Sequence, residues 1–253
     1  MQLLANPAGN YSFLTGIAPY SAGVVAAPGY EIVRAVLARP LAWQEGFERI
    51  ERHLIGLGRP RAALCAVELR SPTPFSFAGF AAFNGAYQAR LAEWGLLLDG
   101  VNPIARTNVA PALSPPAQPS LYAFSYTVPT THTTPTFIVA GAGDLRDQAD
   151  LSPAAIVRPG ETSSDAMHEK AAAVLAVMQE RLFGLGMAWA DVSGVGVYTV
   201  QPLHPLLEST LLPSLHEAIG CGIHWHYSHP PIAGLEFEMD LRGVRVEERV
   251  EKE

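Results

Sequence analysis

A five-residue pattern that occurs twice constrains the fold of this chain more than any other feature. Leu54-Ile-Gly-Leu-Gly58 and Leu182-Phe-Gly-Leu-Gly186 each follow an amphipathic helical pattern and precede a strand-like segment. Such an echo indicates duplicated units, and a missed repeat misassigns the whole fold. The threonine-rich segment 129–135 separates the two copies. We therefore predict two α/β units side by side, with domains at residues 1–130 and 131–253.

Hydrophobic periodicity places the elements of each unit. Apolar residues recur every three to four positions in four segments, which predicts helices over 43–57, 80–94, 162–185 and 206–219. Segments rich in β-branched and aromatic residues predict strands over 30–37, 62–69, 104–112, 121–128, 137–141, 192–200, 223–227 and 235–241. Short apolar segments at 11–16 and 23–26 precede the first of these strands. The expected fold class is α+β, with each domain a mixed β-sheet backed by two helices.

Composition limits the class of partner. Apolar residues make up 49% and charged residues 16%, which indicates a substantial core or a buried subunit interface. The net charge of −7 argues against nucleic acid, because phosphate binding needs clustered Lys and Arg. No segment approaches the roughly 18 apolar residues of a membrane span. Cys65 and Cys221 form no metal or disulfide pattern, which suits a reducing cytosol, and we expect a cytoplasmic protein. We expect the charged tail, residues 242–253, to be solvated.

One arginine and a pair of acids are candidates for chemistry. Arg106 lies at the start of a predicted strand, where its guanidinium can form a two-pronged contact with a substrate carboxylate. The alternative is an ion pair across an interface. Glu236 and Glu238 alternate with apolar residues, so both are predicted on one face of a strand. In an apolar cleft such a carboxylate has a raised pKa and can deprotonate a water, whereas on a solvent-facing strand it has no role.

A histidine pair forms a third candidate group. His224 and His226 are two apart on a predicted strand, a spacing that suits zinc or iron if a third ligand is near. Neutral histidines that are hydrogen-bonded or face the neighbouring domain are the favoured alternative, and we predict no metal. Cys221 has no base fixed beside it by the sequence, which argues against a nucleophile. The side chains considered as a third metal ligand are His204, His216, His229 and Glu236.

Four short motifs resemble the RidA (YjgF) family when taken in their order and spacing. They are Ala18-Pro19-Tyr20-Ser21, Phe83-Asn84-Gly85-Ala86-Tyr87, Pro103-Ile-Ala-Arg106-Thr and Gly234-Leu-Glu236-Phe-Glu238. The resemblance implies two tandem chorismate-mutase-like domains and a homo-oligomer, a trimer or hexamer, with ligand clefts between neighbouring subunits. It implies no metal and no cofactor. Members of the family hydrolyse enamines and imines to ketones and ammonia, and relatives include 2-aminomuconate deaminases of aromatic catabolism.

The chain departs from the family pattern at two positions. Tyr122 stands where the family has its water-positioning glutamate in the first unit, and Cys221 stands where the second unit should have its arginine. One unit therefore keeps the carboxylate anchor and the other keeps the acid. Whether the two share a cleft is open from the sequence.

These features predict an enamine or imine deaminase that acts on a small carboxylate such as a 2-aminomuconate-like intermediate. Arg106 would hold the carboxylate and Glu236 would position the hydrolytic water. Two alternatives stay open, a non-catalytic small-ligand-binding protein and a lyase or hydrolase built on the histidine pair. The predicted substrate-binding residues are Arg106, Tyr20, Asn84, Cys221, His224 and His226.

Overall fold

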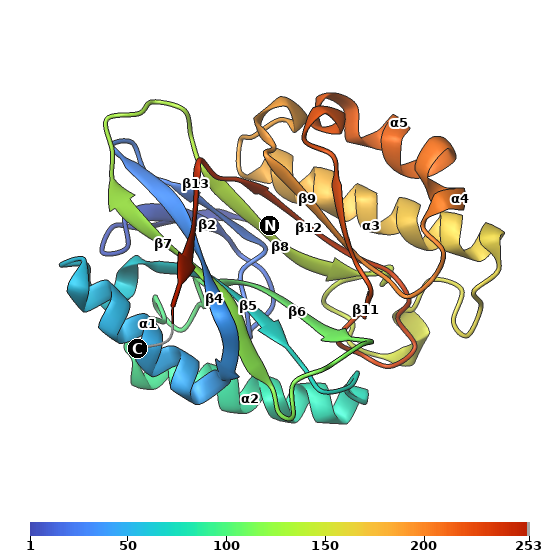
Figure 1. Ribbon diagram of the computed structural model, residues 1–253, viewed down its shortest axis with the longest axis horizontal. Coiled ribbons are helices and arrows are strands. Elements are labelled where there is room, and N and C mark those ends of the chain that lie inside the picture. Colours follow the sequence, from blue (N-terminus) through green and yellow to red (C-terminus); the bar gives the residue numbers. More distant parts are fainter. Residues whose placement is uncertain (252–253) are drawn as a thin grey trace.

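The computed structural model describes residues 1–251 and contains two mixed β-sheets with helices on their outer faces (Figure 1). The first is a seven-stranded sheet in the order β1 (Leu3–Asn6), β2 (Tyr11–Leu14), β3 (Gly23–Ala26), β8 (Phe137–Gly143), β12 (Glu238–Gly243), β9 (Gly194–Tyr198) and β10 (Ile223–His226). The second is a six-stranded sheet in the order β11 (Ser228–His229), β6 (Ala105–Pro111), β5 (Leu64–Arg70), β7 (Ser120–Pro129), β4 (Tyr30–Ala42) and β13 (Val246–Val250). The predicted mixed α+β class is confirmed.

Each sheet carries its own helical layer and core. Helices α1 (Trp43–Gly56) and α2 (Phe77–Glu93) cover the six-stranded sheet, and α3 (Ser164–Gly184) covers the seven-stranded sheet (Figure 1). Phe47 and Tyr87 lie in the hydrophobic core between the six-stranded sheet and its helices, and Met178 and Phe237 lie in the core between the seven-stranded sheet and α3. These helices match the predicted segments 43–57, 80–94 and 162–185. Short helical turns lie at Arg61–Ala63, Pro153–Ala155 and Trp189–Asp191.

The two sheets repeat one strand arrangement. In the six-stranded sheet the order β6-β5-β7-β4 contains a parallel β5–β6 pair, and β7 is antiparallel to both β5 and β4. In the seven-stranded sheet the order β10-β9-β12-β8 contains a parallel β9–β10 pair, and β12 is antiparallel to both β9 and β8. The repeated pentapeptides end α1 and α3 in the same way, because Gly58 and Gly186 both adopt the left-handed conformation, with φ of +64° and +77°.

Strand pairing crosses the predicted boundary near residue 130 in both directions. The boundary falls in the loop between β7 and β8, yet β3 pairs with β8 and brings β1 and β2 into the sheet of the second half. In return β13 pairs in parallel with β4 of the first half. The tail predicted to be solvated is therefore a strand up to Val250, and residues 252–253 lie outside the described residues. The division into domains 1–130 and 131–253 stays a prediction.

The helix predicted over 206–219 is broken into short pieces. They are α4 (His204–Leu206), the π-helical η4 (Leu207–Leu211), α5 (Leu212–Leu215) and the 3-10 turn η5 (His216–Cys221). Pro213 has no N–H to donate to the preceding turn, and η4 ends just before it. His216 then takes a positive φ of +47°, which ends the α-helical path.

Within residues 1–251 no helix is long and apolar enough to cross a membrane. The cytoplasmic location stays a prediction.

Candidate active site

Arg106 is the second residue of β6, and its guanidinium is only 3% exposed. Its Cζ lies 4.6 Å from the ring centre of Tyr20 and 4.8 Å from that of Tyr87, distances at which the ring faces attract a cation. Nη2 donates a 2.7 Å hydrogen bond to Oδ1 of Asn84 on α2. Nη1 is buried and has no hydrogen-bond partner among the described residues. The surroundings therefore fix this guanidinium and leave one of its donors for a ligand.

Hydrogen bonds hold the turn that carries Tyr20 against the segment before β6. Asn102 Nδ2 donates to the Pro19 carbonyl at 2.7 Å, and Ser21 Oγ donates to the Pro103 carbonyl at 3.1 Å. The backbone N–H of Ser21 also donates to the carbonyl of residue 104 at 2.9 Å. Two motifs that are more than 80 residues apart in sequence are joined here, which places the Tyr20 ring over the guanidinium.

Glu238 brings a carboxyl group from the second half of the chain to the same place. It is the first residue of β12, pairs with Gly143 of β8 and is 3% exposed. Its Oε1 lies so close to the place of a Cβ on residue 141 that any larger residue there would have to displace it, so Gly141 gives this carboxyl group its room. Burial, followed by the charge of Asp240, raises the pKa of Glu238 well above its ordinary value, and Arg181 and Arg106 only partly oppose this. No described residue donates a hydrogen bond to this carboxyl group.

Arg106 and Glu238 line one small cavity of about 30 Å³, which is room for about one water molecule. Asn108, two residues after Arg106 on β6, also lines it. The Asn108 Oδ1 accepts from Ser71 at 3.0 Å, while its Nδ2 is buried without a partner among the described residues. Two buried donors and one carboxyl group thus surround the space without pairing to each other. The remaining lining residues are Tyr20, Phe80, Gly141, Gly143, Leu145, Gln148, Leu151, Pro231, Ile232 and Leu235.

A buried ion pair holds the chain that leads into Glu238. Lys170 of α3 and Asp144, directly after β8, are both fully buried, with Nζ 2.8 Å from Oδ2. The other Asp144 oxygen accepts from the backbone N–H groups of Glu236 at 2.9 Å and Phe237 at 3.2 Å. These bonds fix the chain immediately before Glu238. The pair therefore ties α3, the end of β8 and the start of β12 together.

Glu236 and Cys221 lie outside the cavity. Glu236 precedes β12 rather than belonging to it, and its Oε2 accepts from Gln201 Nε2 at 2.9 Å. Only Glu238 of the predicted acidic pair lies beside Arg106. Cys221 Sγ donates to the carbonyl of Ala218 at 3.0 Å, and burial raises the pKa of this thiol. Arg106 and Glu238 thus line one cavity, whereas Glu236, the acid that the sequence indicated, does not line it.

The predicted histidine pair lies on the edge strand β10, apart from the cavity. His226 stacks on Tyr198 with ring centres 4.8 Å apart, and burial followed by the charge of Arg70 lowers its pKa to about 4. His224 is exposed, and its Nδ1 lies 3.2 Å from Nη2 of Arg242. Among residues 1–251 no three His, Cys, Asp or Glu side chains come together as a metal-binding group. Neither histidine lines the space beside Arg106.

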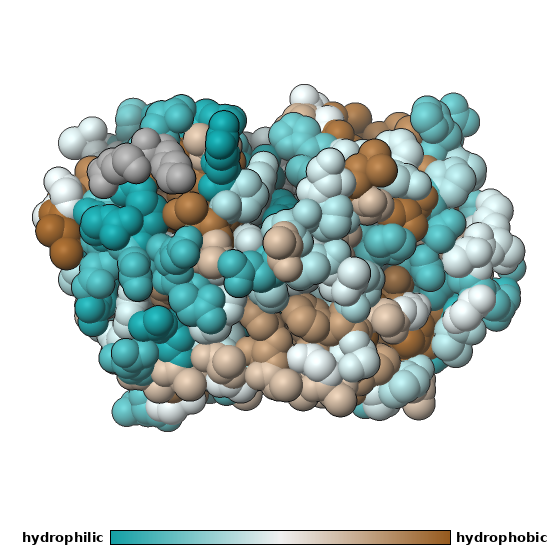
Figure 2. Space-filling model, turned by 60° about the horizontal axis from the view of Figure 1, so that its bottom comes forward, coloured by the Kyte–Doolittle hydropathy of each residue, from teal (hydrophilic) through white to brown (hydrophobic). Residues whose placement is uncertain are grey.

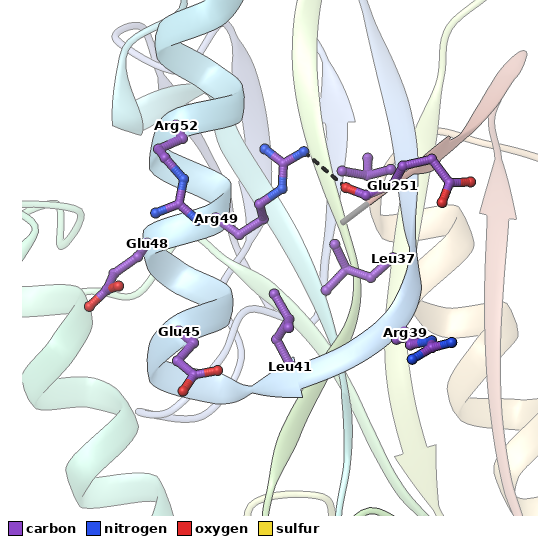
Figure 3. Close-up of a pocket in the computed structure, with 9 residues that line it drawn as sticks. Leu37, Arg39, Leu41, Glu45, Glu48, Arg49, Arg52 and Glu251 are labelled. Atoms are coloured by element: carbon purple, nitrogen blue, oxygen red, sulfur yellow. Dashed lines mark hydrogen bonds between the residues drawn. The ribbon is translucent and has the colours of Figure 1, made fainter. Parts of the chain in front are cut away.

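A separate hollow of about 230 Å³ lies beside α1 (Figure 3). Arg49 points across it toward Glu251, while Leu37 and Leu41 of β4 form its base (Figure 3). None of the predicted site residues lines this hollow. Its lining is mostly charged and shares no residue with the cavity beside Arg106, so it is not the candidate site.

Asn108, Lys170 and Arg181, which lie in or near the cavity, were not predicted as site residues, although the position of each in the sequence pattern is informative. Asn108 lies two positions after Arg106 and therefore on the same face of the strand. Lys170 and Arg181 fall on the apolar face of the helix 162–185, among Met167, Val174 and Met178, where a charged residue is out of place. A charge in a buried helix stripe requires a buried partner or a ligand.

Comparison with known proteins identifies the family. Residues 3–248 match the family model described as 2-aminomuconate deaminase CnbZ. A 2-amino-5-chloromuconate deaminase from Comamonas testosteroni is 43% identical over 241 residues, which are 93% of this chain and 94% of the relative. Among solved structures, a chorismatase covers 96% of this chain and 89% of its own at 11% identity, with a TM-score of 0.41. The YjgF gene product of E. coli covers 44% of this chain and 80% of its own at 13% identity, with a TM-score of 0.29. By its sequence the chain belongs to the CnbZ family of 2-aminomuconate deaminases.

Proposed function

We propose that the protein is a deaminase that hydrolyses the C–N bond of a 2-aminomuconate-like enamine, an intermediate of aromatic catabolism, and releases ammonia. The family relation and the 43% identical deaminase support the reaction. The observation that carries the proposal for the site is the grouping of a buried guanidinium, a buried amide and an unpartnered carboxyl group around one cavity.

Arg106 and Asn108 hold the carboxylate next to the amino group. Their unpaired Nη1 and Nδ2 are donors, and a carboxylate is the ligand that satisfies two such donors at once. Leaving them buried and unpaired costs about 1–3 kcal/mol each, which the bound carboxylate recovers. Burial and the surrounding rings keep water from screening the contact.

Glu238 moves the protons, and it takes the place of Glu236, which the sequence predicted to position the hydrolytic water. Because its pKa is raised, the neutral carboxyl group donates its proton to the enamine carbon and forms an iminium. The resulting carboxylate then accepts a proton from the water that attacks the C=N carbon. The carbinolamine expels ammonia, which takes the hydroxyl proton as the C=O bond forms. Enamine and water thus give a 2-oxo acid and ammonia, and Glu238 ends as it began.

The test is ammonia release from 2-aminomuconate generated in place, measured with a coupled assay. We expect Glu238→Gln to lower kcat by about 10²- to 10⁴-fold. Glu236→Gln is the matched control, because it makes the same change two residues away and outside the cavity, and it should leave kcat unchanged. Arg106→Met should lower kcat/KM by about 10- to 100-fold. Equal losses in the two glutamate variants, or no ammonia from the wild type, would refute the proposal.

We further propose that the two halves are RidA-type, chorismate-mutase-like units and that the protein forms a trimer or hexamer. The repeated strand order supports the first part. The outer face of α2 supports the second, because it is exposed and made of small residues, and Figure 2 shows weakly hydrophobic residues gathered on that side. Light scattering should give the mass of three or six chains, whereas a monomer would contradict the assembly. The exposed residues are Ala78, Ala81, Ala82, Gly85, Ala86 and Ala89.

A further inference from the structure

The cavity beside Arg106 is too small for a six-carbon dicarboxylate, but an open hollow adjoins it. This hollow has a volume of about 250 Å³, and Tyr20 and Gln148 line both spaces. The Gln148 side chain is held by hydrogen bonds from its Nε2 to the carbonyls of Gly143, at 2.9 Å, and Leu145, at 3.2 Å. The part of a ligand that does not fit the cavity can therefore lie in the hollow, past these two side chains.

The hollow contains a second buried guanidinium, that of Arg181 on α3. Arg181 is 4% exposed, and its Nη1 donates to the carbonyls of Ala140 at 2.9 Å and Gly141 at 3.1 Å. No described residue accepts a hydrogen bond from its Nε or Nη2, and none forms an ion pair with it. The same residue 141 that makes room for Glu238 thus also anchors Arg181.

The charges of the two spaces do not balance. Arg106 and Arg181 are buried cations without an ion-pair partner among residues 1–251. Among the described residues that line the two spaces, the only buried carboxyl group is that of Glu238, and its raised pKa favours its neutral form. Asp147 and Glu180 also line the hollow, but both are exposed and hydrated, so they offset the buried charge weakly. A ligand with two negative charges is the complement of this site.

We propose that Arg181 binds the second carboxylate of the substrate, so that the enzyme is built for a dicarboxylate, with one carboxylate at Arg106 and the other in the hollow. This deepens the proposed function and rests on it for the reaction, although not for the binding. Arg181 then selects muconate-like substrates against enamines that carry a single carboxylate.

The test uses two unreactive ligands with the same six-carbon diene chain. trans,trans-Muconate has a carboxylate at both ends, and sorbate has a methyl group in place of one of them. Titration calorimetry on the wild type should show muconate binding about 10- to 100-fold more tightly than sorbate, the size of one charge-assisted contact. Arg181→Met should remove this difference by weakening muconate alone. Arg39→Met makes the same change in net charge in the separate hollow of Figure 3 and should change neither affinity.

Arg181→Met also removes the donor to two buried carbonyls, so Arg181→Lys is the second variant. Its ammonium can donate to those carbonyls and keeps the charge, and part of the preference for muconate should survive in it. Equal affinity of the wild type for the two ligands would overturn the inference, as would a muconate preference that Arg181→Met leaves intact. A preference for muconate without ammonia release from 2-aminomuconate would instead refute only the proposed reaction.

Discussion

Replacing Lys170 by methionine tests the buried ion pair that supports the site. Methionine keeps the length of the hydrocarbon stem, so the change removes chiefly the charge and its hydrogen bonds. Nζ is 2.8 Å from Asp144 Oδ2 and donates to the Val157 carbonyl at 2.6 Å, and both charged side chains are fully buried. Breaking such a pair costs about 3–5 kcal/mol, because the remaining carboxylate is left buried and uncompensated. The carbonyl that loses its donor adds about 1 kcal/mol.

The assay is urea unfolding followed by tryptophan fluorescence and by far-ultraviolet circular dichroism. With a slope of about 3 kcal/mol per molar urea, a loss of 4–6 kcal/mol lowers the midpoint by about 1.3–2 M. The double variant Lys170→Met/Asp144→Asn removes the stranded charge while its amide oxygen still accepts from the N–H groups of residues 236 and 237. It should therefore be more stable than Lys170→Met alone. A single-variant loss below about 1 kcal/mol, within the range of an exposed pair, would refute the reasoning.

Three further predictions concern the pH dependence set by Glu238, the hydrogen bond of Asn84, and His226 on the edge strand β10. Since Glu238 donates first as a neutral acid, kcat/KM should fall as the pH rises through its raised pKa. The Asp240 charge is one cause of the raised pKa, so Asp240→Asn should move that fall to lower pH. A pH–rate profile unchanged by Asp240→Asn would contradict this. Asn84→Ala removes the 2.7 Å hydrogen bond to the Arg106 guanidinium and should lower kcat/KM by about 10- to 100-fold without unfolding the protein; steady-state kinetics beside thermal melting distinguishes this from a loss of fold. The folded-state pKa of His226, about 4, is below its unfolded value of about 6.5, so the folded state binds fewer protons between these pH values. The free energy of unfolding therefore falls as the pH drops from about 6.5 towards 4, by about 2 kcal/mol at pH 5. His226→Phe keeps an aromatic ring to stack on the neighbouring tyrosine and should lack this part of the acid destabilisation, as urea midpoints at pH 7 and pH 5 would show.

The sequence predicted those helices and strands that are stabilised by residues within the same segment. The three long helices appeared where apolar residues recur at helical spacing, and each is followed, two residues after its last residue, by a glycine in the left-handed conformation: Gly58, Gly95 or Gly186. The helix over 206–219 failed because the pattern of apolar residues continued through Pro213, which cannot donate to the preceding turn. The strand β13 was not predicted, because its charged residues indicated a solvated tail. Glu247 is exposed as expected, but it also pairs with Arg34 of β4 at 2.9 Å, within a parallel strand pair.

The sequence predicted the residues that surround Arg106 but did not predict which acidic residue lies beside it. Arg106, Tyr20 and Asn84 belong to motifs whose spacing survives in the fold, and they meet as expected. Glu236, the acid predicted from the sequence, lies outside the cavity, because period-two alternation places Glu236 and Glu238 on one face and does not say where the strand begins. The strand begins at Glu238, because the backbone N–H groups of Glu236 and Phe237 donate to the Asp144 side chain. The start of this strand thus depends on a contact between residues that are 92 positions apart in sequence, which a local sequence pattern cannot predict.

The exchange of strands between the two halves sets an order of events during synthesis. The N-terminal strands β1 to β3 leave the ribosome first, but the strand beside which they belong, β8, begins only at Phe137. Until then β3 has an unpaired edge, the kind of surface on which chains aggregate. At the other end β4 stays without its outer neighbour until Val246 is made. The nascent chain therefore stays incomplete at both sheets until β12 and β13 have been made, and a gene cut at the apparent boundary would encode two halves that each lack a strand held by the other.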